Sequence, residues 1–181
     1  LDTINLLIIG GSQGAKIFDD LLKNTIIELS KKYKLKIYQQ TSFINFESFK
    51  KTYENNNINY ELFNFNDDVI NFMQKTDLCI TRAGASTLAE LNFAEIPYLA
   101  IPLPTAKDNH QFENAYFYNK LGCNWLLNQK KIDEKILLDK LINIIDNKKE
   151  YLVKKKNMKD FIYENTWNNI NLKIISVINE S

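Results

Sequence analysis

The amino-acid sequence predicts an α/β protein in which helices cover both faces of a parallel sheet. Short runs rich in β-branched and aromatic residues alternate with longer amphipathic segments from the N-terminus to about residue 127. Glycines, prolines and polar residues typical of turns separate the two kinds of segment. Because strands that alternate with helices are joined by right-handed crossovers, this rhythm predicts a parallel sheet. The 181 residues are enough for one ordinary domain and too few for two full ones.

The first half of the chain contains three expected strand–helix pairs. The run NLLII predicts a strand over Asn5–Ile9, and the helix expected next, over Ala15–Lys32, carries apolar residues at helical spacing. The two following strands are expected at Lys36–Gln40 and Tyr60–Phe65, and their helices at Phe46–Tyr53 and Asp67–Thr76. Asn66 or Asp67 is the expected cap of the last of these helices.

The second half continues the pattern and then becomes helical. Strands are expected at Leu78–Thr81, Tyr98–Ile101 and Asn124–Leu127, and helices at Thr87–Ala94 and Asp108–Leu121. Pro97 and Pro102 bound the fifth strand, and Gly122 ends the helix before the sixth. The remainder, Ile132 to Asn179, is expected to be all helix. We therefore expect one domain over residues 1–181, with a Rossmann-like core to about residue 147 and C-terminal helices over 148–181.

The composition excludes several classes of protein. A hydrophobic fraction of 45% with 25% charged residues is typical of globular proteins and excludes a disordered chain. The 23 basic and 22 acidic residues give a net charge of +1, so no nucleic-acid partner is expected. Two cysteines without a CxxC pair exclude a cysteine-based zinc site and a disulfide scaffold, and fit a reducing compartment. A single histidine excludes a multi-histidine metal site. Arg82 is the only arginine.

No segment has the features of a membrane span or of a secretion signal. No apolar run approaches the roughly 20 residues that cross a bilayer, and the N-terminus lacks a basic region and a cleavage site. Lys154–Lys156 lies in a helix that is expected to be amphipathic. We interpret these lysines as a solvated face, with attraction to an anionic surface as the alternative.

In sheets of this type, ligands bind at the carboxyl ends of the strands. The first candidate segment there is Gly10–Ala15, whose glycines and following helix suit a phosphate. The dinucleotide pattern GxGxxG would need glycine where Ile9 stands, and a P-loop would need lysine directly after Gly14. A tight turn without any ligand is the alternative interpretation.

The second candidate segment, TRAGASTLAE, covers Thr81–Glu90. Its small residues leave room for a ligand, and Gly84 to Thr87 offer N–H and hydroxyl donors to a phosphate at the helix start. The carboxylate of Glu90 could accept hydrogen bonds from both hydroxyls of a ribose. Alternatively, Thr87 and Glu90 form a capping box, which needs no ligand.

Two further segments complete the candidate edge. In PLPTAKDNHQFENA, prolines precede a cluster of polar side chains that suits a hydroxylated ligand such as a sugar. Asp108 as an N-cap and His110 as a solvated residue are the alternatives. In Phe65–Asp68, backbone groups could pair with the edge of a base.

In this order and spacing, GGSQGA, FNDD, TRAGASTLAE and the proline-rich segment resemble the C-terminal half of the MurG family. Members of that family are bacterial, inverting transferases of GT-B fold, which move GlcNAc from UDP-GlcNAc to a lipid-linked muramoyl-pentapeptide, converting lipid I to lipid II in peptidoglycan synthesis. The resemblance covers essentially the whole chain. It implies that the nucleotide-sugar donor binds here, and that the acceptor binds an N-terminal domain absent from this sequence.

The resemblance also implies which residues bind UDP-GlcNAc. Ser12 is expected at the diphosphate, Glu90 at the ribose hydroxyls and Gln111 at the GlcNAc hydroxyls. Asn66 is expected beside the uracil, through its backbone, although an apolar residue is common there. The phosphates and sugar are expected against Ala85, Ser86, Thr87, Leu88 and Ala89. A secondary role is expected for Gly11, Gln13, Gly14, Arg82, Gly84 and His110.

The remaining expectations concern chemistry and location. No cofactor or metal is expected, so helix N-termini and hydroxyls would stabilise the departing UDP. The resemblance places the catalytic base in the absent N-terminal half, and the whole protein on the cytoplasmic face of the inner membrane, bound peripherally to its anionic surface. Two alternatives are the donor-binding subunit of a split lipid-linked GlcNAc transferase and a non-enzymatic Rossmann-like binding domain.

Overall fold

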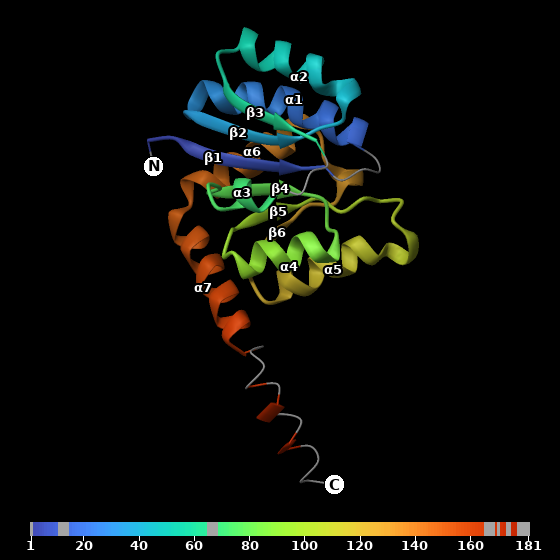
Figure 1. Ribbon diagram of the computed structural model, residues 1–181, viewed down its shortest axis with the longest axis vertical. Helices are drawn as coiled ribbons and strands as arrows, with labels where there is room; N and C mark the ends of the chain where they lie inside the picture. The colour runs from blue at the N-terminus through green and yellow to red at the C-terminus, as the bar shows by residue number, and fades with distance from the viewer. Residues whose placement is uncertain are drawn as a thin grey trace.

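A computed structural model describes residues 2–10, 15–64 and 69–164, together with 169, 171–172 and 175–176. Its centre is a six-stranded sheet in the order β3-β2-β1-β4-β5-β6, and every pairing is parallel. Figure 1 shows helices on both sides of this sheet. The order reverses between β1 and β4, which is the crossover point of a doubly wound fold. The predicted fold class is confirmed.

The strands lie within one or two residues of their predicted limits. They are β1 (Ile4–Ile9), β2 (Leu35–Gln40), β3 (Asn59–Phe63), β4 (Leu78–Thr81), β5 (Tyr98–Ala100) and β6 (Trp125–Leu126). The prediction is correct because these runs are apolar and β-branched, and most of them are buried between helices.

The helices are α1 (Ala15–Lys32), α2 (Phe43–Asn55), α3 (Val69–Met73), α4 (Ala85–Phe93), α5 (His110–Lys120), α6 (Glu134–Asp146) and α7 (Lys148–Glu164). Two short 3-10 turns, η1 (Lys107–Asn109) and η2 (Gln129–Lys131), precede α5 and α6. The limits predicted for α1 are confirmed. The caps predicted for α3, Asn66 and Asp67, lie outside the described residues.

Within the described residues, the helical remainder expected from Ile132 consists of two helices that meet at Asn147. This residue separates α6 from α7 with a φ of −89° and a ψ of 69°, which are not helical. Its side-chain oxygen accepts a hydrogen bond from the Glu150 N–H at 3.1 Å and so caps α7. Helix α7 therefore begins at Lys148, the residue from which the C-terminal helices are expected.

The core has one layer on each face of the sheet. Along β1, Leu6 and Ile8 pack with α1, α2 and α6, whereas Leu7 and Ile9 pack with α3, α4, α5 and α7. This alternation follows from the two-residue period of a strand. Because both layers are apolar, the sheet holds its strand ends in fixed positions, and those ends carry the candidate site.

One lysine of the predicted solvated face is instead buried. Lys154 is 8% exposed, and its Nζ donates to the Asn124 carbonyl at 2.8 Å. The ammonium lies 4.7 Å from the centre of the Trp125 ring and 3.7 Å from a carboxylate oxygen of Glu150. Burial lowers the pKa of Lys154. The interpretation as a solvated face is therefore wrong for Lys154, which joins α7 to β6, and it holds for the exposed Lys156.

We expect Lys154→Ala to lower the free energy of unfolding by about 2 kcal/mol or more, because a charged hydrogen bond and a cation–π contact are lost together. Lys156→Ala is the matched control and should change it by less than about 0.5 kcal/mol. Urea unfolding of the three proteins measures both values. Equal stability of the two variants would show that the buried contacts of Lys154 contribute nothing.

Candidate functional site

Two of the four candidate segments meet at the carboxyl edge of the sheet. Residues 82–84 connect β4 to α4, and residues 101–109 connect the neighbouring β5 to α5. The other two segments fall largely outside the described residues, and with them the predicted Gly11, Ser12, Gln13, Gly14 and Asn66. The geometry of the site is therefore built from the ends of β4 and β5 and the starts of α4 and α5.

Helix α4 presents its N-terminus to this edge. Gly84 is the N-cap, with a φ of −64° and a ψ of 136°, and no side chain caps the helix. The backbone N–H groups of Ala85, Ser86 and Thr87 are in the first turn, where they have no acceptor within the helix. Such N–H groups, together with the positive end of the helix dipole, suit an anionic ligand.

The capping box considered for Thr87 and Glu90 is wrong. The helix begins at Ala85, so Thr87 is the third helical residue and cannot be the N-cap. Glu90 lies more than one turn into the helix and is exposed. Its carboxylate is thus not used at the helix start. Ribose binding by Glu90 stays a prediction.

The predicted contact residues on α4 differ in their exposure. Ala85, Ser86 and Ala89 are exposed, whereas the side chain of Leu88 is fully buried in the core. The Leu88 N–H donates to the Gly84 carbonyl at 3.0 Å. A ligand on this helix would therefore contact the side chains and first-turn N–H groups around Ser86. Leu88 instead packs the helix against the core.

Helix α5 holds the loop after β4 with two side-chain amides. The Gln111 carbonyl oxygen accepts hydrogen bonds from the Ala83 N–H at 3.2 Å and from the Leu103 N–H at 3.0 Å. The Asn114 amide donates to the Ala83 carbonyl at 3.1 Å. Gln111 is half-buried, and its amide nitrogen carries two further donors that a sugar hydroxyl could accept. The Gln111 oxygen thus joins two loops, which no sequence pattern predicts.

The start of α5 differs from the alternative interpretation of Asp108. The N-cap is Asn109, and both Asp108 and Asn109 have a positive φ, 51° and 55°. Asn and Asp are the non-glycine residues that adopt this conformation most readily. His110 is exposed, and its Nδ1 donates to the Lys107 carbonyl at 2.6 Å, which closes the turn. The His110 ring therefore stabilises the loop before α5 through the Lys107 carbonyl.

Arg82 is buried, with 4% of its surface exposed. Its guanidinium Nη1 donates to the Ile101 carbonyl at 3.0 Å and to the side-chain oxygen of Gln129. Its side-chain contacts are therefore internal to the protein, and the secondary role expected for it at the site stays a prediction.

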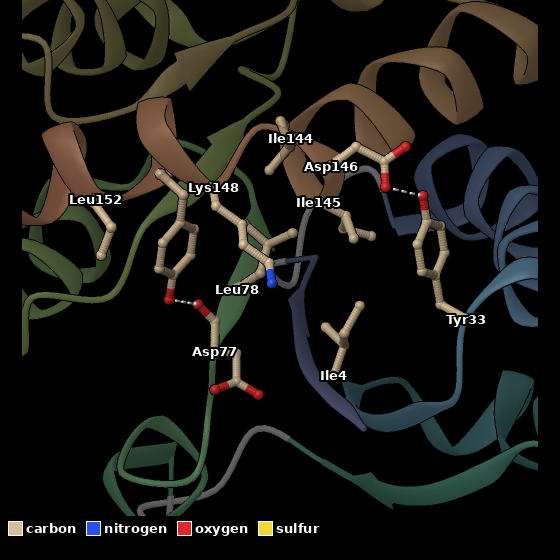
Figure 2. A pocket seen from close by; sticks show the side chains of 10 residues that line it. Ile4, Tyr33, Asp77, Leu78, Ile144, Ile145, Asp146, Lys148 and Leu152 are labelled. Carbon is tan, nitrogen blue, oxygen red and sulfur yellow. Dashed lines mark hydrogen bonds between the residues drawn. The ribbon is translucent and has the colours of Figure 1, made fainter. Parts of the chain in front are cut away.

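The structure also contains a hollow of about 460 Å³ at the opposite, amino edge of the sheet. Figure 2 shows it between the start of β1, the end of α6 and the start of α7. The Tyr33 hydroxyl donates to Asp146 at 2.6 Å, and the Tyr151 hydroxyl donates to the Asp77 carbonyl at 2.8 Å. Hydrogen bonds from Tyr33 and Lys32 lower the pKa of Asp146. None of the predicted site residues lines this hollow, whose hydrogen bonds join α6 and α7 to the rest of the domain.

Comparison with known proteins identifies the family. Residues 5–166 match the model of the glycosyltransferase family 28 C-terminal domain. The chain belongs to glycosyltransferase family 28. None of the helices in the described part of this family 28 domain combines the length and hydropathy that a membrane span needs.

Similar family members carry the name expected from the motifs. The chain is 88% identical over all of its 181 residues to the UDP-N-acetylglucosamine–N-acetylmuramyl-(pentapeptide) pyrophosphoryl-undecaprenol N-acetylglucosamine transferase of Pelagibacter ubique, and covers 51% of that protein. It is 43% identical to the Rickettsia bellii protein of the same name, over 81% of the chain and 42% of the relative. The chain thus spans about half the length of these relatives.

A solved structure agrees with this assignment. The crystal structure of MurG from Acinetobacter baumannii superposes with a TM-score of 0.75 at 28% identity, over 87% of this chain and 45% of that one. The resemblance to the MurG family that the four motifs indicated is confirmed by these matches. The individual contact residues stay predictions.

We expect Gln111→Ala to lower the free energy of unfolding by about 1–2 kcal/mol, since two half-buried N–H groups lose their acceptor. Gln111→Glu keeps an acceptor oxygen and places a negative charge near a helix N-terminus, so it should cost less than about 0.5 kcal/mol. Urea unfolding of both variants checks this difference. A Gln111→Ala variant as stable as Gln111→Glu would show that the hydrogen bonds to Ala83 and Leu103 are dispensable.

Proposed function

We propose that this chain is the UDP-GlcNAc-binding half of an inverting glycosyltransferase that moves GlcNAc to a lipid-linked muramoyl-pentapeptide, converting lipid I to lipid II. The observation that carries the proposal is the uncapped N-terminus of α4, with Glu90 exposed on the same helix, at the carboxyl edge beside the β1–β4 crossover. This position is where doubly wound sheets bind nucleotides. The names of the relatives support the same activity.

Each part of the donor has a proposed partner on this edge. The first-turn N–H groups of α4 bind the diphosphate, together with Ser12 of the glycine-rich segment. Glu90 accepts hydrogen bonds from the ribose hydroxyls, and the amide nitrogen of Gln111 donates to a GlcNAc hydroxyl. Asn66 pairs with the uracil through its backbone. Ser12 and Asn66 rest on the sequence motifs alone.

The reaction is a displacement at the anomeric carbon of GlcNAc. The acceptor hydroxyl loses its proton to a base and forms the new glycosidic bond, while the bond to the diphosphate breaks and UDP leaves with the electron pair. The α4 N-terminus stabilises the negative charge that develops on UDP. No residue of this chain is assigned as the base, which we propose to lie in a part of the whole protein outside this chain.

The whole protein's acceptor and location follow from this activity. We propose that the lipid-linked acceptor binds outside this half, and that the whole protein is held peripherally at the anionic cytoplasmic face of the inner membrane. Neither a resident cofactor nor a nucleic-acid partner is part of the proposal, and UDP-GlcNAc is a substrate.

We expect the chain to bind UDP and UDP-GlcNAc more tightly than ADP or NAD, because Ile9 stands where the dinucleotide pattern needs glycine. Calorimetric titration of the four ligands against the chain measures this preference. Binding of NAD without binding of UDP would contradict the proposed function. Binding of none of the four would favour a non-enzymatic domain of the same fold.

We expect Glu90→Gln to weaken UDP binding by about ten- to a hundredfold, since charge-assisted hydrogen bonds to the ribose are worth roughly 1.5–3 kcal/mol. Stability should stay within about 0.5 kcal/mol, because Glu90 is exposed and does not cap its helix. Glu61→Gln, an exposed carboxylate on β3, is the matched control and should leave UDP affinity unchanged. A Glu90→Gln variant with normal UDP affinity would refute the ribose contact.

A further inference from the structure

Arg82 connects the ends of several strands at the carboxyl edge. Its backbone N–H donates to the Ile9 carbonyl at 3.1 Å, at the end of β1. Its own carbonyl accepts the Thr81 hydroxyl at 2.7 Å, at the end of β4. Its side chain reaches Ile101, directly after β5, and Gln129, in the η2 turn that follows β6. One residue thus contacts the end of β1 and the segments after β5 and β6.

The chemistry of this position favours arginine over lysine. Arg82 is the only arginine in a chain with 23 basic residues, and it is almost completely buried. A guanidinium presents several N–H donors in one rigid plane, so it can hold acceptors from separate segments in a fixed geometry. A lysine ammonium is a flexible point charge and is more strongly hydrated, so it would hold the same acceptors less firmly.

Gln129, which contacts Arg82, lies outside all four sequence motifs of the proposed donor site. It belongs to η2, is half-buried, and offers the side-chain oxygen that accepts from the Arg82 guanidinium. The next residue of the same loop, Ala83, is held by Gln111 and Asn114. The loop that precedes α4 is therefore fixed at two successive residues, by side chains from η2 and from α5.

We propose that Arg82, held by Gln129, is a positioning residue for the donor site, a role that rests on the proposed function. It fixes residues 82–84 so that the N-terminus of α4 meets the donor diphosphate in one orientation. When the hydrogen bond to Gln129 is lost, the loop samples other arrangements. The apparent affinity then falls in proportion to the fraction of molecules that keep the binding-competent one.

The test compares two variants of Gln129 in the intact chain. Gln129→Met removes the acceptor and retains the apolar stem, and we expect UDP binding about three- to tenfold weaker by calorimetry. Gln129→Glu retains an oxygen that accepts from the guanidinium, so UDP affinity should return to within about threefold of the unmodified chain. Gln74→Met, an exposed glutamine after α3, is the matched control and should bind UDP normally.

A second variant separates positioning from general stability. Arg82→Met removes the donor and should weaken UDP binding, and Gln129→Met added to it should cause no further loss, because the guanidinium that Gln129 holds is already absent. Additive losses, a normal UDP affinity in Gln129→Met, or no rescue by Gln129→Glu would each overturn the positioning role. If the unmodified chain binds no UDP, the proposed function fails, and this role fails with it. If it does bind UDP and Gln129→Met binds equally well, only the positioning role fails.

Discussion

The parallel ladder between β1 and β4 determines where everything else in this domain can lie. It pairs Leu6 with Leu78 and Ile9 with Thr81, residues far apart in the sequence. Because the winding direction reverses at this ladder, the crossovers on either side of it place helices on opposite faces. The strand ends then meet at one edge, where the α4 N-terminus and the loop before α5 come together. A change that weakened the ladder would separate these parts.

Beyond the end of the sheet, side chains take over from the ladder. The backbone N–H and carbonyl of Ala83 have no neighbouring strand there, and the amides of Gln111 and Asn114 bond them instead. Arg82 does the same for the Ile101 carbonyl. Backbone polar groups that are shielded from water need such partners, since leaving one unbonded costs roughly 1–3 kcal/mol. The candidate site thus has a rigid base although its two segments are loops.

The sequence predicts this fold well where apolar patterning decides the structure, and poorly where single polar contacts do. The limits of α1 and β4 follow from periodicity and are confirmed. The predicted start of α4, Thr87, lies two residues after the observed start, Ala85. Threonine is a better N-cap residue than glycine, yet Gly84 occupies the N-cap position. In the sequence, Lys154 cannot be distinguished from the neighbouring lysines. Its burial is explained by its contacts with the Trp125 ring and the Asn124 carbonyl.

The same distinction holds for the candidate site. The predicted segments after β4 and β5 lie together in the structure, as expected for neighbouring parallel strands. No sequence pattern revealed that the Gln111 oxygen is engaged by Ala83 and Leu103, or that Gln129 contacts Arg82, because these contacts join residues whose spacing follows no period. Ser12 and Asn66 stay predictions, since they lie outside the described residues.

The groups that tie this edge together also fit the charge of the proposed donor. Amides and a guanidinium fix the loop before α4, whereas a carboxylate in their place would repel a diphosphate bound to the first-turn N–H groups. Glu90 lies more than one turn along the helix, where its charge can serve hydroxyls without opposing the phosphates at the N-terminus. The positive N-terminus of α4 and the Glu90 carboxylate thus lie at different points along the helix. This arrangement matches a ligand that is anionic at one part and hydroxylated at another.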